Sequence, residues 1–333
     1  MTAAGQDPRP LVDSFGRVHR DLRISVTDRC NFRCTYCMPV EGMEWLPRSE
    51  VLTFEELERL ARILVERHGI RSIRITGGEP TVRAHLPVLV AKLAALPVDL
   101  ALTTNGATLR SCAADLAGAG LRRVNVSLDS LRADRFAAMT RRDELTNVLD
   151  GIDAAVEAGL APVKVNAVVV RGVNDDEVVD LARYGRDRGV LVRFIEFMPL
   201  DGGDEWRSDQ VVSQAEILER ISAVFPLESM TRGHEPAERF RYLDGRGEVG
   251  VIPSVTRPFC EQCDRIRLTA DGQLRSCLFS LEDHDLRDVL RSGGSDDDLS
   301  DVIEACVGEK WAGHAINQVQ FVRPRRSMSQ IGG

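Results

Sequence analysis

The segment Cys30-Asn31-Phe32-Arg33-Cys34-Thr35-Tyr36-Cys37 spaces three cysteines as C-x3-C-x2-C. Thiolate sulfur is a soft metal ligand, and closely spaced cysteines suit an iron–sulfur cluster or zinc. Three cysteines are one fewer than a [4Fe–4S] cluster requires, so one iron would keep an open position for chemistry, much as a catalytic zinc does. A structural zinc site, or buried thiols grouped by chance, is the disfavoured alternative because zinc sites more often use C-x2-C spacing.

A second group of three cysteines, Cys260, Cys263 and Cys277, lies far along the chain. The sequence Ala270-Asp271-Gly272-Gln273 predicts a hairpin turn that would bring Cys277 back beside the other two. On spacing alone, a structural zinc site completed by His284 or Cys306 is the alternative. Two separate groups of three cysteines favour metal binding more strongly than either group alone.

Length, charge and cysteine usage narrow the class of protein. The chain has 333 residues and a formal net charge of −8, which argues against nonspecific binding to nucleic acid or membranes. No apolar run reaches the ~18 residues of a membrane span, and residues 1–20 lack the apolar core of a secretory signal. We therefore expect a cytoplasmic protein whose cysteines are reduced thiols or metal ligands, with Cys112 and Cys306 outside both groups.

Strands and helices alternate through the first 200 residues. The predicted strands cover residues 22–27, 72–76, 98–104, 123–128, 163–170 and 190–197. Repeated βα units predict an α/β fold with a parallel sheet, here a partial TIM-type (β/α)6 barrel in residues 1–200. The site of such a fold gathers at the carboxyl ends of the strands. Residues 201–333 are expected to form a C-terminal α+β extension that carries the second cysteine group.

Several local features are also predicted. Capping boxes at Thr53 and Ser213 begin two helices, and Asn174 is expected to cap a third. Residues 293–298 are expected to form a solvated acidic loop. The tail, residues 323–333, is too polar to build a core. It ends in glycines that could enter a narrow space, so we hypothesise that it reaches into the active-site cavity.

The alternation of side chains along the predicted strands collects cations on one face. Successive side chains point to opposite faces, and the apolar set must face the helices. The opposite face then carries Arg23, Arg74, Lys164 and Arg193 beside hydroxyls and amides. Burying these cations without anions would be costly, so the interior should bind a polyanionic ligand. For any one of them, a salt bridge at the end of a strand is the alternative.

The first cysteine group, with Tyr36 before its last cysteine, resembles the radical S-adenosylmethionine (SAM) superfamily. Gly77-Gly78-Glu79-Pro80, after the second strand, is similar to the segment that holds the amino group of SAM in that superfamily. Residues 21–29, the second group with its Arg265-x-Arg267, and the terminal Gly332-Gly333 resemble one family within it. That family is the GTP 3′,8-cyclases, which act first in the biosynthesis of the molybdenum cofactor (molybdopterin).

This resemblance, which covers the chain from about residue 11 onward, implies two [4Fe–4S] clusters and SAM as cofactors. The first cluster would be held by Cys30, Cys34 and Cys37, and the second, which meets the guanine base, by Cys260, Cys263 and Cys277. The residues similar to SAM contacts are Tyr36, Gly78, Ser127 and Met198, with Thr104 as a neighbour. Those that would bind GTP are Arg23, Arg74, Thr103, Lys164, Arg193, Arg265 and Arg267. The catalytic residues would be Arg23, Arg265 and Arg267.

The implied reaction begins with one-electron cleavage of SAM to methionine and a 5′-deoxyadenosyl radical. That radical takes a hydrogen from C3′ of GTP, and the resulting carbon radical attacks C8 of guanine to give 3′,8-cyclo-7,8-dihydro-GTP. The implied partners are an external electron donor and the next enzyme of the molybdopterin pathway, which receives the product. A homodimer is compatible with the sequence, which does not decide the oligomeric state. The alternatives are a radical SAM peptide-modifying enzyme and a non-catalytic, zinc-stabilised binding protein.

Overall fold

The computed structural model describes residues 8–39, 43–200, 206–231, 233, 235–316 and 321–332. The predicted domain boundary adjoins residues outside these ranges, and the last glycine, Gly333, also lies outside them.

A twelve-stranded mixed sheet organises the molecule, with strand order β14-β13-β12-β3-β4-β5-β6-β7-β8-β11-β10-β9. Neighbouring strands from β12 to β11 are parallel, and the pairs at both ends of the sheet are antiparallel. The strands are β3 (Asp21–Ser25), β4 (Ser72–Thr76), β5 (Asp99–Thr104), β6 (Arg123–Ser127), β7 (Val163–Val169), β8 (Leu191–Glu196), β9 (Leu227–Ser229), β10 (Glu238–Tyr242), β11 (Glu248–Ile252), β12 (Arg265–Leu268), β13 (Gln273–Arg275) and β14 (His284–Asp285), and β1 (Leu11–Val12) and β2 (Val18–His19) form a separate pair.

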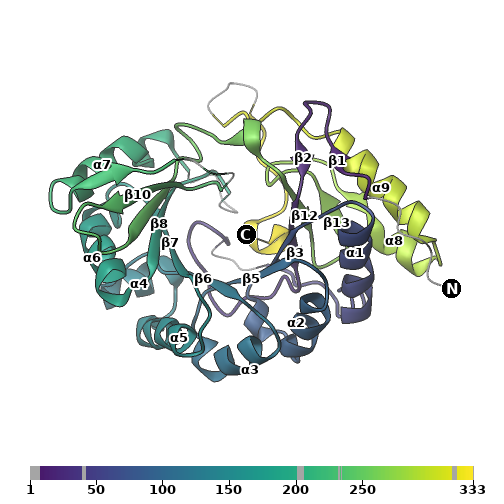
Figure 1. The fold of residues 1–333 in the computed structure, drawn as a ribbon, viewed down its shortest axis with the longest axis horizontal. Helices are drawn as coiled ribbons and strands as arrows, with labels where there is room; N and C mark the ends of the chain where they lie inside the picture. Colours follow the sequence, from purple (N-terminus) through teal and green to yellow (C-terminus); the bar gives the residue numbers. More distant parts are fainter. Residues whose placement is uncertain are drawn as a thin grey trace.

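Helices cover the outer side of this curved sheet, and the C-terminus lies near the centre of the view (Figure 1). They are α1 (Phe54–Glu66), α2 (Leu86–Ala94), α3 (Ala113–Gly118), α4 (Ala133–Thr140), α5 (Leu145–Glu157), α6 (Val178–Arg188), α7 (Gln214–Ser222), α8 (Leu286–Arg291), α9 (Asp296–Gly308) and α10 (Met328–Ile331). Short 3-10 helices are η1 (Pro80–Val82), η2 (Leu109–Ser111), η3 (Asp175–Glu177), η4 (Ser208–Gln210) and η5 (Cys260–Gln262). No helix in the described ranges combines the length and apolarity needed to cross a bilayer.

The α/β class and the parallel order of the six predicted strands are confirmed. Alternate residues on the helix-facing side of the strands, such as Leu22, Ile24 and Ile75, are fully buried in the main apolar core. Within the described residues, no strand pairing joins β14 to β9, so the sheet is open rather than a closed barrel. The extension does not stand apart from the first half, because β12 pairs in parallel with β3 and β11 pairs with β8.

Both predicted capping boxes are present. Thr53 caps α1 with Glu56, and Ser213 caps α7 with Glu216, each side chain bonding the backbone of the other residue. Such reciprocal bonds satisfy N–H groups that the first turn of a helix leaves without intrahelical partners.

Three local predictions are wrong. The side chain of Asn174 caps no helix; it bonds instead to the backbone of Val168, Val170 and Asp129. The segment 293–298 is not simply a loop, because Ser295 caps α9 and three aspartates occupy its first turn. The tail, expected to be too polar to build a core, forms α10 and buries the apolar side chain of Ile331.

Candidate active site

The first cysteine group lines a cavity of about 180 Å³ at the carboxyl ends of β4, β5 and β6. Its lining includes Cys30, Cys34, Cys37, Tyr36, Gly78, Thr103, Thr104, Ser127, Asn166, Ile195, Met328 and Ser329. Polar residues that follow parallel strands meet at one edge of the sheet, as the α/β architecture predicts. The cavity therefore unites the predicted cluster ligands with three of the four predicted SAM contacts.

Gly77 and Gly78 allow the loop after β4 to lie directly against the segment before Cys30, since a Cβ on Gly77 would lie 2.7 Å from the Thr27 carbonyl oxygen. A Cβ on Gly78 would lie 2.6 Å from the carbonyl oxygen of Arg29 and would also collide with that of Asp28. The Gly78 N–H donates to the carbonyl of Thr27 at 2.7 Å, and the Glu79 N–H donates to that of Arg29 at 2.8 Å. Any larger side chain at Gly78 would displace the cysteine loop from the sheet.

Two buried acids fix the walls of this cavity. Glu79 accepts hydrogen bonds from Thr104 Oγ1 at 2.7 Å and from the Asn105 N–H at 2.6 Å. Tyr36 donates its hydroxyl to Asp129 Oδ2 at 2.6 Å, and the other oxygen of Asp129 accepts the Val168 N–H. Burial raises the pKa of Asp129 to about 6. The aromatic residue of the cysteine motif is thus held by the end of β6.

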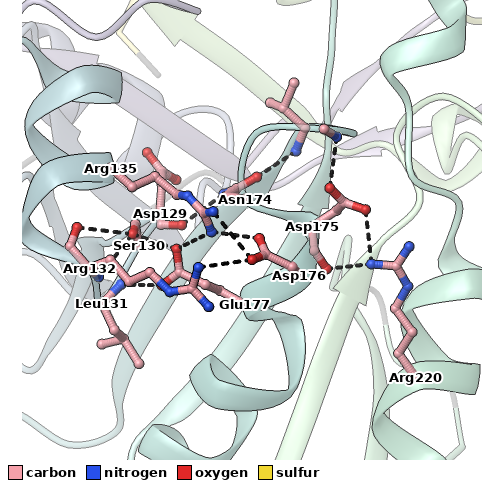
Figure 2. Close-up of polar contacts among 12 residues, drawn as sticks. Asp129, Ser130, Leu131, Arg132, Arg135, Asn174, Asp175, Asp176, Glu177 and Arg220 are labelled. Atoms are coloured by element: carbon pink, nitrogen blue, oxygen red, sulfur yellow. Dashed lines mark hydrogen bonds and ion pairs between the residues drawn. The ribbon is translucent and has the colours of Figure 1, made fainter.

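The loop that carries Asp129 is itself tied to the start of the η3–α6 segment (Figure 2). The Asn174 side chain donates to the Asp129 carbonyl, and Glu177, which is fully buried, accepts from the Ser130 hydroxyl and the Leu131 N–H. Arg135 pairs with Glu177 at 2.7 Å. These bonds satisfy buried polar groups and hold the end of β6 in one position.

The sulfurs of the first group lie in a setting that fits ligation to a cluster. Burial, and then the nearby Cys30 thiol, raise the pKa of the Cys37 thiol to about 12, which opposes a free thiolate, whereas the surrounding hydrogen-bond donors favour the charged form. Backbone N–H groups of Phe32 and Ser329 bond to Cys30 and Cys37, and the Asn105 amide lies 3.9 Å from Cys30 Sγ. Donors of this kind stabilise the negative charge of cluster sulfurs.

The second cysteine group lines an adjoining cavity of about 160 Å³. Thr103, Asn166, Ile195 and Met328 line both cavities, so the two hollows meet there. The second is also lined by Arg23, Arg74, Arg193, Met198, Arg265, Arg267, Cys260, Cys263 and Cys277. The predicted hairpin is present as the β12–β13 pair. Burial raises the pKa of the Cys260 thiol, and the Cys277 and Cys263 thiols are close enough to add to the shift.

Register places the arginines of this cavity side by side. Arg23 on β3 pairs with Arg74 on β4 and with Arg267 on β12. Arg193 is held at a distance by Asn125 and Asn166, whose amide oxygens each accept a bond of 2.9 Å. Neighbouring strands are only about 4.8 Å apart, so these cations repel one another.

The cations of this cavity are short of anionic partners. Burial, and then the charges of Arg267, Arg74 and Arg265, hold the pKa of Arg23 well below its usual value. Burial and the Arg74 charge lower the pKa of Arg193 to about 9. Among the described residues, the Nε atoms of Arg23 and Arg74 are buried and have no hydrogen-bond partner. Buried donors without partners are rare, and here they point to an anionic ligand in the cavity.

A polar network backs the second cysteine group. The ammonium of Lys310, which is almost fully buried, lies 3.6 Å from Cys263 Sγ, 2.7 Å from the Arg265 carbonyl and 3.5 Å from His19 Nδ1. His19 in turn contacts Asp13 at 3.1 Å. A fixed cation beside a thiolate stabilises the charged form of the sulfur.

Neither alternative zinc ligand joins this group. His284 pairs with Glu309 at 3.1 Å, and Cys306 is buried in the core between α9 and the sheet. In the described part of the chain, no set of three or more His, Cys, Asp or Glu side chains is arranged to hold a metal ion. Thiolates of one cluster bind different irons and so need not converge on a single point.

The tail occupies the space between the two cysteine groups. Met328 lines both cavities, and the Gly332 carbonyl accepts a 2.7 Å bond from Arg267. Gly332 has φ +86°, and a Cβ there would lie 2.7 Å from Thr76 Oγ1 and 2.9 Å from Ser25 Cβ. Only glycine fits both the conformation and the space. The hypothesis that the tail enters the cavity is therefore confirmed as far as Gly332, and Gly333 lies outside the described residues.

Two predicted site residues lie apart from their groups. Met198 lines the second cavity but not the first, so it is not among the residues that surround Tyr36. Lys164 lies at the start of β7 and lines a separate hollow, where it pairs with Glu235 at 3.2 Å. The proposed roles of both residues stay predictions.

Several residues of the site were not predicted. Asp129 and Glu79 stand in loops that the sequence marks clearly, and their position after a strand could have identified them as candidates. Lys310 carries no such signal, because only the fold brings α9 and the residues after it against β12. Met328 and Ser329 were likewise hidden in a tail that reads as polar.

Two family models match the chain in succession. The model of the radical SAM superfamily matches residues 24–185, and the model named Molybdenum Cofactor Synthesis C matches residues 190–316. The first match contains the first cysteine group, and the second contains Cys260, Cys263 and Cys277.

Relatives that share about half of the residues extend over nearly the whole chain. A protein of Rhodopirellula baltica named GTP 3′,8-cyclase is 53% identical over 335 residues, which cover 98% of this chain and 93% of the relative. A protein of Streptomyces coelicolor with the same name is 48% identical and covers 100% of this chain and 99% of its own length.

Solved structures share the fold at much lower identity. SuiB of Streptococcus suis superposes with a TM-score of 0.63 at 13% identity, covering 94% of this chain and 77% of SuiB. The same protein bound to S-adenosylmethionine gives a TM-score of 0.61 at 15% identity, covering 82% of this chain and 66% of SuiB. At such identities the likeness concerns the fold alone.

Proposed function

Because this chain belongs to the GTP 3′,8-cyclase family of radical SAM enzymes, we propose that it converts GTP to 3′,8-cyclo-7,8-dihydro-GTP in molybdenum cofactor biosynthesis. The observation that carries the proposal is a pair of adjoining cavities. One is lined by the superfamily's three cysteines, and the other by three further cysteines and a set of arginines that are short of anionic partners.

The first cavity belongs to SAM and an iron–sulfur cluster, as in the superfamily. When bound, they supply one-electron cleavage of SAM and a radical able to take a hydrogen atom from carbon. In this assignment Cys30, Cys34 and Cys37 hold the cluster. Tyr36, Gly78 and Ser127 would contact SAM, and Asp129 would fix the Tyr36 ring through its short hydrogen bond.

The second cavity would hold GTP. Arg23, Arg74 and Arg267 stand on adjacent strands. The Nε–H groups of Arg23 and Arg74, which have no partner in the described residues, are suited to donate hydrogen bonds to the anionic oxygens of a triphosphate. Bound phosphate would offset the charges of Arg267, Arg74 and Arg265, which add to burial in holding the pKa of Arg23 below its usual value. Thr103, which lines both cavities, would lie between the nucleotide and SAM.

Lys164 would contact the phosphate end of the substrate, and its ion pair with Glu235 bears on how it would do so. Glu235 now lies beside Lys164, where a phosphate would bind. Burial alone would raise the pKa of Glu235, but attraction to Lys164 and Arg193 outweighs it and lowers the pKa. For Lys164 to bind phosphate, this ion pair must open. Glu235 would then act as a displaceable counterion, which lowers the cost of burying Lys164 in the empty protein.

Cys260, Cys263 and Cys277 would hold a second [4Fe–4S] cluster facing the guanine base, with Arg265 and Arg267 beside it. The Gly332 carbonyl would orient Arg267, and the tail would shield the reactive centre from water. The finer description of the fold as a partial (β/α)6 barrel with domains at 1–200 and 201–333 belongs to the same proposal. So do the external electron donor, hand-over of the product, a homodimer and a cytoplasmic location.

Anaerobic protein supplied with SAM, a reductant and GTP tests the proposal. We expect about eight irons per chain, from two four-iron clusters, and 5′-deoxyadenosine formed together with the cyclised nucleotide. 5′-Deoxyadenosine without cyclised GTP would leave radical chemistry but reject the substrate. Zinc in a colourless protein would favour the scaffold alternative. The peptide-modifying alternative has only the likeness in fold to SuiB in its favour.

A further inference from the structure

Six arginines surround the first cysteine loop without pairing to carboxylates. They are Arg29, Arg33, Arg48, Arg83, Arg141 and Arg142, named here the cysteine-loop arginines. Elsewhere, many surface arginines form ion pairs, as Arg110, Arg132 and Arg188 do with aspartates, although scattered exposed ones such as Arg71 and Arg122 form none in the described residues. In the described ranges, no ion pair involves any of the six. This local excess of positive charge stands out in a chain of net charge −8.

Backbone carbonyls, not acids, hold the inner members of this set. Arg33 donates to the carbonyl of Cys30 at 2.6 Å, and Arg142 donates to that of Asn31 at 2.9 Å. Arg141 donates to the carbonyl of Arg33 at 3.1 Å. A carbonyl fixes a guanidinium without cancelling its charge, so these positive charges remain available beside the loop.

The outer members line a groove of about 510 Å³ on the other side of the loop. Arg29 and Arg48 are exposed, and Arg83 lies over the Phe54 ring while donating to the Val26 and Leu52 carbonyls. Glu55 and Glu56 temper the Arg83 charge, but Glu56 is itself paired with Arg291.

Residues 43–48 join the two sides into one surface. The Arg33 guanidinium stacks 5.1 Å from the centre of the Trp45 ring, and Leu46, which donates its N–H to Asp28 at 2.6 Å, lines the groove beside Arg48. The result is a predominantly basic surface with apolar and aromatic elements, in which Glu44 and Asp143 are exposed acids, and it adjoins Cys30, whose carbonyl accepts from Arg33. Arginine and aromatic residues are enriched at the centres of protein–protein interfaces, so this composition suits a docking surface.

We propose that the cysteine-loop arginines dock an acidic one-electron carrier protein that reduces the first cluster. This inference rests on the proposed function, which requires a source of electrons. In the step concerned, a carrier such as a flavodoxin in its anionic hydroquinone form loses one electron to the cluster. The flavin becomes a neutral semiquinone, and no bond or proton moves. The position of the surface beside Cys30 brings the donor near the acceptor, and opposite charges speed their encounter.

A nucleic acid is the other polyanion that such a surface could bind. The overall charge of −8 opposes a long polyanion that extends beyond six arginines, whereas a small acidic protein needs only a local patch. A nucleic acid bound beside the cysteine loop would also supply no electron to the first cluster. The two partners are separated by experiment.

The test compares two double charge reversals. Arg29→Glu with Arg48→Glu alters the proposed surface. Arg71→Glu with Arg122→Glu is the matched control, because both are exposed and directly precede β4 and β6, at the edge of the sheet away from the cysteine loop. Iron content and the visible spectrum of each variant verify that the clusters are intact. Neutralisation to Gln at residues 29 and 48 supplies a graded variant.

Binding of a purified bacterial flavodoxin is measured by titration calorimetry at about 0.02 M and about 0.3 M salt. We expect the unaltered chain to bind at low salt and to weaken at high salt. The Arg29/Arg48 reversal should weaken low-salt binding by about tenfold or more, the Gln variant by less, and the control hardly at all. Failure of the unaltered chain to bind, equal losses in both reversals, or tighter binding of a single-stranded RNA 20-mer than of flavodoxin would overturn the proposal.

Reduction separates this inference from the proposed function. Reduced methyl viologen, a small cation, should support 5′-deoxyadenosine formation in the reversal variant as well as in the unaltered chain. Flavodoxin-driven formation should fall in the reversal variant alone. If viologen and GTP give no cyclised nucleotide in any variant, the proposed function fails, while the binding result still decides the docking surface.

Discussion

At the scale of single residues, the second cavity is defined by charge that the protein leaves uncompensated. Arg23 and Arg74 bury guanidinium groups whose Nε atoms bond to nothing in the described chain. Unsatisfied buried donors cost about 1–3 kcal/mol each, and more for charged groups. A fold that retains such groups gains from them only when an anion binds, which ties their cost to function.

Replacing Arg74 by Ala should therefore weaken GTP binding far more than guanosine binding. Charge-assisted contacts to phosphate contribute about 1.5–3 kcal/mol, or roughly ten- to a hundredfold in affinity. Calorimetric titration of both ligands measures the difference, and Arg74→Lys should retain part of the affinity. Equal losses for nucleotide and nucleoside would show that Arg74 does not contact phosphate.

Cys34 is the middle cysteine of the first group, and burial, followed by the charges of Cys37, Asp129 and Cys30, raises its pKa. Replacing Cys34 by Ala should abolish 5′-deoxyadenosine formation from SAM. The other group should be unaffected, so iron per chain should fall by about half, from roughly eight to four. Iron assay and product chromatography test this. Retained SAM cleavage would reject the assignment of the first group.

Lys310 should tune a cluster at the second group without touching substrate. Replacing Lys310 by Met removes a positive charge 3.6 Å from Cys263 Sγ, which makes the addition of an electron less favourable. We expect the midpoint potential to fall by roughly 60 mV, a tenfold change for a one-electron couple. Redox titration followed by electron paramagnetic resonance measures this, with Lys310→Arg as the charge-preserving control. An unchanged potential in the Met variant would contradict it.

At the scale of elements, local chemistry allowed the strands and most helices to be predicted, and context explains the failures. The strand at 72–76 and the caps at Thr53 and Ser213 follow from short-range patterns. Asn174 is a residue type that often caps helices. Its amide instead donates to backbone carbonyls of strand β7 and of the Asp129 loop, and the Asp129 loop is brought near only by tertiary structure. The acidic run at 296–298 reads as a loop, yet aspartates are favourable in the first turn of a capped helix.

The cap of α7 gives a prediction with a defined pH dependence. Hydrogen bonds from Ser213 and the Arg171 charge outweigh desolvation and lower the pKa of Glu216 to about 2. The charged form is therefore the stabilising one, so its contribution is present above pH 4.5 and is lost as the pH falls toward 2.

Glu216→Gln should reduce the free energy of unfolding by less than about 1 kcal/mol at pH 7, because the side chain is partly exposed and solvent screens its ion pair. The gap between variant and parent should narrow as the pH is lowered from 5 toward 4. Urea unfolding of the metal-free protein at several pH values measures it. A gap that widens at lower pH would contradict the assignment.

At the scale of the whole molecule, the site depends on neighbours that are distant in sequence. Strand parity predicted that Arg23, Arg74 and Arg193 share an interior face, because alternation is a local rule. It could not show that β12 would lie beside β3 and add Arg267, nor that Lys164 would open into a separate hollow. Those facts depend on strand order and on the curvature of the sheet, which no local pattern encodes.

The tail is the clearest case in which only the structure of the whole molecule explains where a segment lies. Burial of Ser329 and Ile331, together with the bond from Arg267 to the Gly332 carbonyl, anchors the end of the chain inside the curved sheet (Figure 1). Beside Gly332, Ser25 and Thr76 leave no room for a Cβ. Residues added to the end of the chain would have to leave the crowded space around Gly332, and the tail would be displaced.

Appending several residues after Gly333 should therefore cut GTP cyclisation by roughly tenfold or more, since loss of the Gly332 contact frees Arg267, and small misplacements of catalytic groups cost about that much. Both clusters should remain, because no cysteine ligand lies in the tail. Iron content and 5′-deoxyadenosine yield serve as controls. Proteolytic removal of the extension back to Gly333, or a free peptide that copies residues 323–333, should restore part of the activity by refilling the same space. Full activity in the extended protein would mean that the anchored tail takes no part in the reaction.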